Sequence, residues 1–317
     1  MPKLAVKEAR QALHIFKKET LIRGQPTEIE CVEIAGQNYA INRRPVTIVS
    51  LEDEWYEDVN DVDCVLNTLR ADSELEVDLF TFWQRLPDVQ PQYQFHLEWE
   101  SIAALSVQSY DYWFNNQISS RVRSQIRKAT KEGLNLREVA YDDEFVRGMT
   151  EIFNEAPVRQ GRRFWHYGKD FETIKRQFSR HVNREDLIGA YYNGELIGFI
   201  MLGNAGEYGI TGQIISKLKH RDKATNNALI GKAIDVCARK NLPYLVYFHW
   251  THDSLAEFKR RCGFEEIKVP RYFVPLTRKG KLALKLGLHR GWKAALPDRL
   301  KSPLKKLRKS WYDFTQK

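Results

Sequence analysis

The sequence lacks long apolar runs and paired cysteines. None of its apolar segments reaches the roughly 18 residues that a membrane-spanning helix needs, and its first segment, MPKLAVKEARQALHIFKKE, is charged and has no apolar signal-peptide core. Its four cysteines lie far apart and form no CxxC pair, which argues against a zinc knuckle or a disulfide framework. These absences predict a cytoplasmic protein with reduced cysteines.

Motifs for several kinds of catalysis are also missing. The sequence has no GxSxG motif and no P-loop, and its eight histidines show no spacing typical of metal ligands. We therefore expect neither a Ser-His-Asp triad nor a metal centre.

What the sequence does have is an uneven charge. The net charge of the 317 residues is +9. Residues 268–317 hold fifteen Lys and Arg against two Asp, whereas residues 51–100 hold fourteen acids against two Arg. A polyanion or an anionic membrane is therefore expected to meet the C-terminal end first.

Periodicity and turn residues predict a regular series of elements from residue 118 onward. A helix is expected from Ser119 or Ser120 to Gly133. Asn193-Gly194 joins two apolar segments and predicts a tight β-hairpin. After the first helix, the predicted order is β, α, α, β, β, β, α, β, α, β, over residues 134–140, 142–156, 170–182, the hairpin 187–202, 208–216, a helix carrying residues 229–237, 243–250, 253–262 and 271–276.

This order, with the phrase LAEFKRRCGFEE at 255–266, resembles the GNAT (Gcn5-related N-acetyltransferase) superfamily over roughly residues 118–277. The segment RSQIRKATKEG at 123–133 resembles the Fem-type aminoacyltransferases, which are built from two tandem GNAT-like halves. The phrase NEAPVRQGRRFWHYGK at 154–169 is similar to one in uncharacterised bacterial GNAT-like proteins. The resemblance implies an α/β (α+β) fold with a mixed, mostly antiparallel sheet flanked by helices.

The first 117 residues fit a shortened second copy of such a unit. RPVTIVSL, DVDCVLNTLRAD, EVDLFTFW and QYQFHLEW are typical of a strand, a helix and two strands. We therefore predict a degenerate GNAT-like half-domain over 1–117, a GNAT acyltransferase-like domain over 118–277 and a basic amphipathic tail over 278–317.

The GNAT resemblance also implies a donor site. In that superfamily the pyrophosphate of acyl-CoA binds a Q/R-x-x-G-x-G/A turn at the start of the helix after the third strand. Here that turn has the leading arginine and lacks both glycines, so aminoacyl-tRNA stays open as the donor in place of acyl-CoA or acetyl-CoA. A solvated basic loop capped by Thr225 or Asn226 is the alternative. The implied donor-binding residues are Ile214, Ile215, Arg221, Lys223, Ala224, Thr225, Asn226 and Asn227.

The segment 154–169 is the predicted acceptor site, because it gathers charged and polar side chains between two helices. Several arginines there favour an acceptor that bears a carboxylate or phosphate. Glu155 and His166 are candidate bases. The alternative is an exposed arginine-rich loop whose Phe164 and Trp165 fill the core. The predicted acceptor-binding residues are Arg159, Gln160, Arg162, Arg163, Tyr167 and Lys169.

The strand at 243–250 supplies two more candidate catalytic residues. Alternation along a strand places Tyr247 and His249 on one face and Phe248 and Trp250 on the other. A histidine beside aromatic residues is more often a hydrogen-bonded core residue, which is the alternative for His249.

The leading interpretation is an acyl- or aminoacyltransferase that moves an acyl group to an amine of a small or cell-envelope-related acceptor. The alternatives are a non-catalytic binding protein of the same fold and an RNA-associated protein. In the tail, Leu300, Leu304, Leu307 and Trp311 share one helical face among lysines and arginines. This pattern predicts either peripheral attachment to an anionic membrane or packing of the tail on the acidic N-terminal region.

Overall fold

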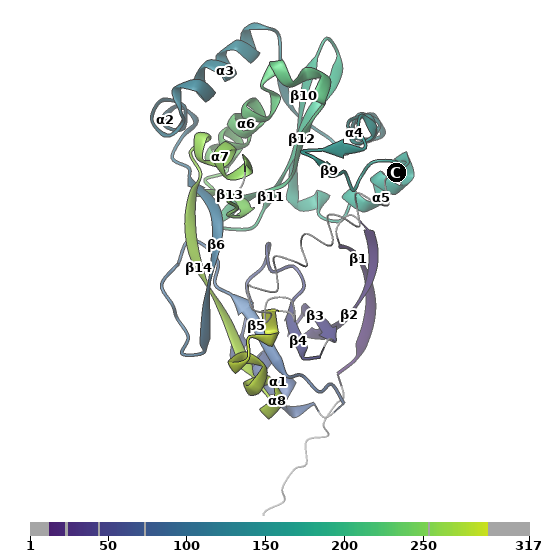
Figure 1. Cartoon of the computed structure of the whole chain (residues 1–317), viewed down its shortest axis with the longest axis vertical. Coiled ribbons are helices and arrows are strands. Elements are labelled where there is room, and N and C mark those ends of the chain that lie inside the picture. The colour runs from purple at the N-terminus through teal and green to yellow at the C-terminus, as the bar shows by residue number, and fades with distance from the viewer. Residues whose placement is uncertain (1–12, 23–24, 44, 73, 253, 291–317) are drawn as a thin grey trace, which may run out of the picture.

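A computed structural model describes residues 13–22, 25–43, 45–72, 74–252 and 254–290. Twelve strands form one sheet in the order β1-β2-β3-β4-β5-β14-β6-β13-β12-β11-β10-β7 (Figure 1). These strands are β1 (Ile15–Ile22), β2 (Gln25–Ile34), β3 (Gln37–Arg43), β4 (Thr47–Leu51), β5 (Leu79–Trp83), β6 (His96–Ser106), β7 (Asn135–Val139), β10 (Glu185–Tyr192), β11 (Glu195–Asn204), β12 (Tyr208–Ser216), β13 (Tyr244–His249) and β14 (Glu265–Pro275).

Helices cover this sheet, and the long strands β6 and β14 run from one half of the molecule to the other (Figure 1). The α-helices are α1 (Val62–Ala71), α2 (Tyr110–Tyr112), α3 (Ser120–Lys131), α4 (Asp143–Asn154), α5 (Phe171–Phe178), α6 (Thr225–Arg239), α7 (Ser254–Arg261) and α8 (Arg278–Lys285). Short helical segments are η1 (Trp113–Gln117), η2 (Val182–Arg184), η3 (Leu218–Lys223) and η4 (Leu288–Arg290).

The predicted fold class is confirmed. β7, β10, β11 and β12 are antiparallel neighbours, and β13 then joins β12 in parallel. β6 and β14 continue the sheet as antiparallel strands, and β14 pairs with β5. The result is a mixed, mostly antiparallel sheet with helices packed on it.

Local signals in the sequence explain where several elements begin and turn. The Ser119 side chain accepts from Val122 N and caps α3, as predicted. Asn193 and Gly194 have φ of 50° and 80°, the left-handed values of a tight turn between β10 and β11. Gln160 and Gly161 also have positive φ, 52° and 72°, and they connect two short strands, β8 (Val158–Arg159) and β9 (Arg162–Arg163). The segment predicted as a loop thus contains a hairpin.

Three strands near the N-terminus were not predicted from the sequence. β1, β2 and β3 form antiparallel pairs, with Ala35 and Gly36 at the turn between β2 and β3. Their side chains are largely polar, so the apolar signal along them is weak. The domain boundary at residue 117 stays a prediction. We note that β6, on its N-terminal side, pairs with both β13 and β14.

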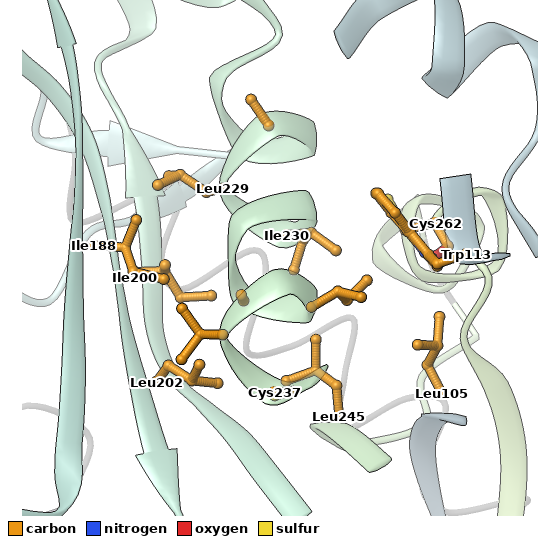
Figure 2. Packing of buried hydrophobic residues seen from close by; sticks show 14 of the residues in the cluster. Leu105, Trp113, Ile188, Ile200, Leu202, Leu229, Ile230, Cys237, Leu245 and Cys262 are labelled. Atoms are coloured by element: carbon orange, nitrogen blue, oxygen red, sulfur yellow. The ribbon is translucent and has the colours of Figure 1, made fainter. Parts of the chain in front are cut away.

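The largest core cluster forms around α6. Ile188, Ile200 and Leu202 of the sheet pack on one side of this helix, and Trp113 and Cys262 lie on its other side (Figure 2). The Trp113 side chain is fully buried, and its Nε1 donates to Cys262 O at 2.9 Å. This packing fixes the position of α6, whose first turn faces the predicted donor site.

The described part of the tail contains α8, which packs through Gly280 and Ala283. Gly280 lies so close to Asp78 O that a methyl group there would be 2.0 Å from it. The predicted helical face at residues 300–311 lies outside the described residues. None of the described helices has the length and apolar character to cross a membrane.

Candidate donor and acceptor site

The sheet opens where β12 and β13 separate. The two strands pair in register at three positions, from Tyr208↔Tyr244 to Ile210↔Val246. β12 has a bulge at Gly212, where the register with β11 shifts, and then runs on to Ser216. β13 instead stays paired with β6 as far as His249, with a register shift after Val246. Two neighbouring strands with diverging backbones leave a gap into which an extended group can enter.

A cavity of about 800 Å³ lies along the end of β12 that β13 leaves unpaired. The β12 end, the α6 start, the β8–β9 hairpin, α3 and α7 all contribute to its wall. It therefore brings together the predicted donor turn and part of the predicted acceptor segment. The predicted residues that line it are Ile214, Ile215, Arg221, Ala224, Thr225, Asn226, Asn227, Arg159, Gln160 and Arg163.

Ala224 replaces a glycine of the donor pattern and keeps a glycine-like backbone. Its φ of 52° and ψ of 32° are left-handed, and it is the N-cap residue of α6, without a side-chain cap. Helix N-termini leave their first N–H groups without intrahelical acceptors. The backbone at this turn thus presents donors to the cavity as a glycine turn would, although the sequence has no glycine there.

Two side-chain oxygens in the first turn of α6 are buried and lack a partner. Thr225 is 2% exposed, and neither its Oγ1 nor Asn226 Oδ1 has a hydrogen-bond partner among the described residues. Asn227 is held in place, since its Nδ2 donates to Gln125 Oε1 at 2.7 Å. Buried polar atoms are normally paired, so a ligand in the cavity would complete this turn.

Three arginines make the cavity wall positive. Arg121 of α3, Arg163 of the hairpin and Arg221 of the donor turn all line it. Among the described residues no carboxylate forms an ion pair with any of the three. Unpaired arginines beside a helix N-terminus form a site for an anion.

Glu155 and Arg159 hold the donor turn. The Glu155 carboxylate accepts from Leu218 N at 2.5 Å and from Lys219 N at 2.9 Å. Arg159 Nη2 donates to Glu155 Oε2 at 3.0 Å, and its Nη1 donates to Ser216 O at 2.8 Å. Both Glu155 oxygens are therefore occupied, which gives this residue a positioning role in place of the predicted role as base.

Several predicted site residues do not line the cavity. Arg162 and Tyr167 are exposed on the segment. Lys169 Nζ donates to Gln177 Oε1 at 2.6 Å. Lys223 Nζ lies 3.1 Å from Glu132 Oε2, and hydrogen bonds to that carboxylate and to Asp222 raise the pKa of Lys223.

His166 belongs to an aromatic cluster instead of the site. Its ring stacks on Phe153 at 4.8 Å and lies 5.2 Å from Phe178. Burial, together with repulsion from Lys169, lowers the pKa of His166 to about 4. The ring is therefore neutral near pH 7, and it packs between α4 and α5 away from the cavity wall.

The prediction from alternation along β13 was wrong. Phe248 has a φ of 47°, and the register with β6 shifts between Val246 and His249. Because this bulge interrupts the alternation, Phe248 and His249 both lie 5.1 Å from the Trp55 ring. Tyr247 instead packs on the other side with Phe264, 5.8 Å away, and burial raises its pKa. Neither Tyr247 nor His249 lines the cavity.

Sequence reasoning missed wall residues on α3 and α7. Arg121 and Gln125 lie one turn apart on α3, and Phe258 and Arg261 come from α7. The Fem-like pattern at 123–133 includes Gln125 and is the one signal in the sequence that points to this residue. No sequence signal indicated that α7 would reach the same cavity.

One cluster has the residue types of a metal site. His96, Glu98 and His289 bring possible ligand atoms within 4.8 Å of one another. Glu98 is already paired, because its carboxylate lies 2.6 Å from His289 Nε2 and accepts from Arg290 Nε at 3.0 Å. Hydrogen bonds and ion pairs therefore already join Glu98 to His289 and Arg290.

No protein family model matches the chain, and no curated protein is similar to it in sequence. The chain is similar in structure to the C-terminal domain of a putative lysylphosphatidylglycerol synthetase from Agrobacterium fabrum, with a TM-score of 0.54 and 10% identity over 81% of this chain and 87% of that one. L-PGS from Bacillus licheniformis has a TM-score of 0.50 and 13% identity over 77% and 83%. FemX has a TM-score of 0.49 and 11% identity over 87% and 90%. At identities of 10% and 13%, the first two likenesses show a shared fold alone.

Proposed function

We propose that this chain is an acyl- or aminoacyltransferase that binds a phosphate-bearing donor in the cavity at the start of α6 and moves the acyl group to an amine. The observation that carries this proposal is the convergence of Arg121, Arg163 and Arg221 on the first turn of α6, beside the gap between β12 and β13. Positive side chains and helix N–H groups suit the phosphates of the donor, and the gap suits an extended acyl arm.

The cavity volume supports a large donor. About 800 Å³ lies at the upper end of small-molecule sites, which span roughly 300–1,000 Å³. Both CoA thioesters and the acylated end of an aminoacyl-tRNA carry phosphates as well as a reactive carbonyl. The name of the putative lysylphosphatidylglycerol synthetase of similar fold favours an aminoacyl donor and a lipid acceptor, whereas the glycine-like backbone at Ala224 favours CoA.

The β8–β9 hairpin offers a matched pair of variants to test the donor site. Arg163 lines the cavity and Arg162 does not, although both are exposed and adjacent. Arg163→Glu should weaken the binding of CoA about tenfold or more, or about 1.4 kcal/mol, because a charge-assisted contact becomes a repulsion. Arg162→Glu changes the net charge equally and should leave affinity within about twofold. Isothermal titration calorimetry with CoA measures both.

Aminoacyl-tRNA is tested by filter binding with the same two variants. If neither CoA nor charged tRNA distinguishes Arg163→Glu from Arg162→Glu, the proposed donor site is wrong. Formation of an amide product from acetyl-CoA or charged tRNA would separate an enzyme from a non-catalytic binding protein of this fold.

We also propose that residues 278–317 attach the protein peripherally to an anionic membrane. Leu282 and Leu286 of the α8 region are each 56% exposed, and Lys281 and Lys285 beside them are exposed as well. Exposed leucines among lysines suit the boundary between headgroups and acyl chains.

Sedimentation with vesicles tests this attachment without truncation, which would also remove the packed Gly280 and Ala283. The double variant Leu282→Ser, Leu286→Ser should bind phosphatidylglycerol vesicles less than the wild type does and should keep its melting temperature. Phosphatidylcholine vesicles are the control. A full-length protein that stays in the supernatant with phosphatidylglycerol at low salt would rule the attachment out.

A further inference from the structure

A carboxyl group with one oxygen that lacks a partner lies where the two halves of the molecule meet. Glu185 is the first residue of β10, and its Oε1 accepts from the Tyr56 hydroxyl at 3.2 Å. Its Oε2 is buried and has no hydrogen-bond partner among the described residues. An unpaired buried carboxylate oxygen is costly to a fold, so its presence calls for a physical reason.

Two glycines make room for this pair. A methyl group on Gly212 would lie 3.2 Å from Glu185 Oε1, and one on Gly203 would lie 2.6 Å from the Tyr56 hydroxyl oxygen. Any larger residue at these positions would displace the two side chains. Gly212 is also the bulged residue of β12, and its neighbour Gln213 lines the donor cavity. The Glu185 carboxyl therefore lies against the bulge of β12, two residues beyond Ile210, where the pairing of β12 with β13 ends.

Tyr56 comes from the acidic segment 52–57, near the N-terminus. Contacts of this segment with residues 181–184, just before β10, fix the position of the Tyr56 side chain. Its ring stacks on His181 at 4.6 Å. His181 Nε2 lies 3.6 Å from Asp53, and Arg184 Nη2 lies 2.8 Å from Glu57. Burial, with a contribution from Glu185, raises the pKa of Tyr56, so its hydroxyl remains a donor.

We propose that Glu185 is the general base of the transfer reaction and that the acceptor amine reaches the acyl group from the side of the sheet where Tyr56 meets Glu185. This inference rests on the proposed function. The ammonium group of an acceptor supplies the donor that Oε2 lacks. The residues predicted as bases do not fill this role, because Glu155 is occupied and His166 lies in an aromatic cluster.

The proton balance is simple. The acceptor ammonium gives one proton to the Glu185 carboxylate, and the freed nitrogen lone pair attacks the acyl carbon. The C–N bond forms, the C–S bond of a thioester or the C–O bond of an ester breaks, and a second nitrogen proton goes to the leaving atom. Glu185 then releases its proton to water.

The environment of Glu185 suits this exchange near neutral pH. Burial raises the pKa of Glu185 to about 7, and the hydrogen bond from Tyr56 opposes that rise. A base whose pKa is close to the working pH is the most efficient at proton transfer. Tyr56 and Tyr141 are the titratable groups that interact with Glu185. Asp53, His181 and Arg184 are next to Tyr56, and Arg180 and Glu57 pair with Asp53 and Arg184.

The first measurement needs no substrate. In protein labelled with ¹³C at the glutamate carboxyl carbons, one resonance should titrate near neutral pH and should be missing from Glu185→Gln. Tyr56→Phe should move that titration to higher pH, because the hydrogen bond that lowers the Glu185 pKa is lost. Titration of Glu185 in its ordinary acidic range would overturn the assignment.

The second measurement compares two acceptors with acetyl-CoA as donor. Ethanolamine is protonated near neutral pH and needs a base, whereas hydroxylamine is already neutral there. Glu185→Gln should lower transfer to ethanolamine about 100-fold or more and change transfer to hydroxylamine far less. Asp186→Asn is the control, because Asp186 is adjacent but pairs with Lys240 at 2.7 Å.

Failure of the proposed transferase function and failure of the Glu185 role give different experimental results. A wild-type protein that binds neither CoA nor charged tRNA contradicts the proposed function. A wild-type protein that transfers to ethanolamine, with Glu185→Gln equally active, contradicts the role of Glu185 and leaves the transferase intact. A variant that loses both acceptors equally also overturns the role as base, because the defect would then be one of structure.

Discussion

One residue at the candidate site adopts a backbone conformation that its amino-acid type disfavours. Ala224 adopts left-handed dihedral angles at the start of α6, a conformation that costs an alanine roughly 1–2 kcal/mol. The sequence indicated the charge of this turn correctly. Its backbone shape could not be predicted, because alanine normally avoids that region and the surrounding structure imposes it.

Ala224→Gly should therefore raise the free energy of unfolding by about 0.5–1 kcal/mol, since glycine accepts positive φ without strain. Ala228→Gly, four residues along the same helix, is the matched control and should lower it by about 1 kcal/mol or more. Urea denaturation measures both. Destabilisation by Ala224→Gly would contradict the left-handed assignment.

His166 makes the free energy of unfolding decrease as the pH is lowered. Its pKa is about 4 in the folded chain and 6.5 ordinarily, so its neutral form contributes stability above pH 6.5. That contribution is lost as the pH falls from 6.5 through about 4, because the unfolded chain takes up the proton first. His166→Phe should flatten the loss between pH 7 and 4.5 in urea denaturation. An equally steep loss in this variant would show that other groups cause it.

Elements were predicted best where the signal was local. The Asn193-Gly194 hairpin and the capped helix α3 follow from neighbouring residues, and both predictions were confirmed. The bulge of β13 was missed, because a side chain of the next helix, outside the strand itself, supports it. Lys259 of α7 is 1% exposed, and its Nζ donates to Tyr247 O at 2.7 Å and to His249 O at 2.8 Å.

We expect Lys259→Met to lower the free energy of unfolding by about 2 kcal/mol or more, because two carbonyl groups lose a buried charged donor. Arg260→Met is the control. Arg260 is exposed and pairs with Glu257, so its loss should cost no more than about 0.5 kcal/mol. Thermal and urea unfolding of the two variants should differ accordingly. Equal stability would mean that the bulge does not depend on Lys259.

At the scale of the whole molecule, the acidic N-terminal segment forms ion pairs with arginines that are distant in the sequence. The composition predicts the acidic segment but not these arginine partners. Arg180 Nη2 lies 2.8 Å from Asp53, and Arg271 Nη2 lies 3.0 Å from Glu54. These pairs join residues 127 and 217 positions apart in the sequence. Charge patterning can therefore predict that the chain is polarised, but the pairing depends on how the two halves meet.

The continuity of the sheet leads to a prediction about where the chain can be divided. β6 pairs with β13 on one side and with β14 on the other, and Trp113 packs against α6. A fragment 118–290 lacks β6 and Trp113, so β13 and β14 would each have an unpaired edge and the core around α6 a large void. A fragment 94–290 retains β6 and Trp113.

The fragment 94–290 should therefore unfold cooperatively in urea, with a near-ultraviolet circular dichroism spectrum typical of fixed aromatic side chains. The fragment 118–290 should show little cooperativity and should aggregate, because it exposes strand edges and the apolar face of α6. The predicted boundary at residue 117 makes the opposite prediction. If 118–290 unfolds as cooperatively as 94–290, the GNAT-like unit begins at residue 118 and β6 contributes only to the joining of the two halves.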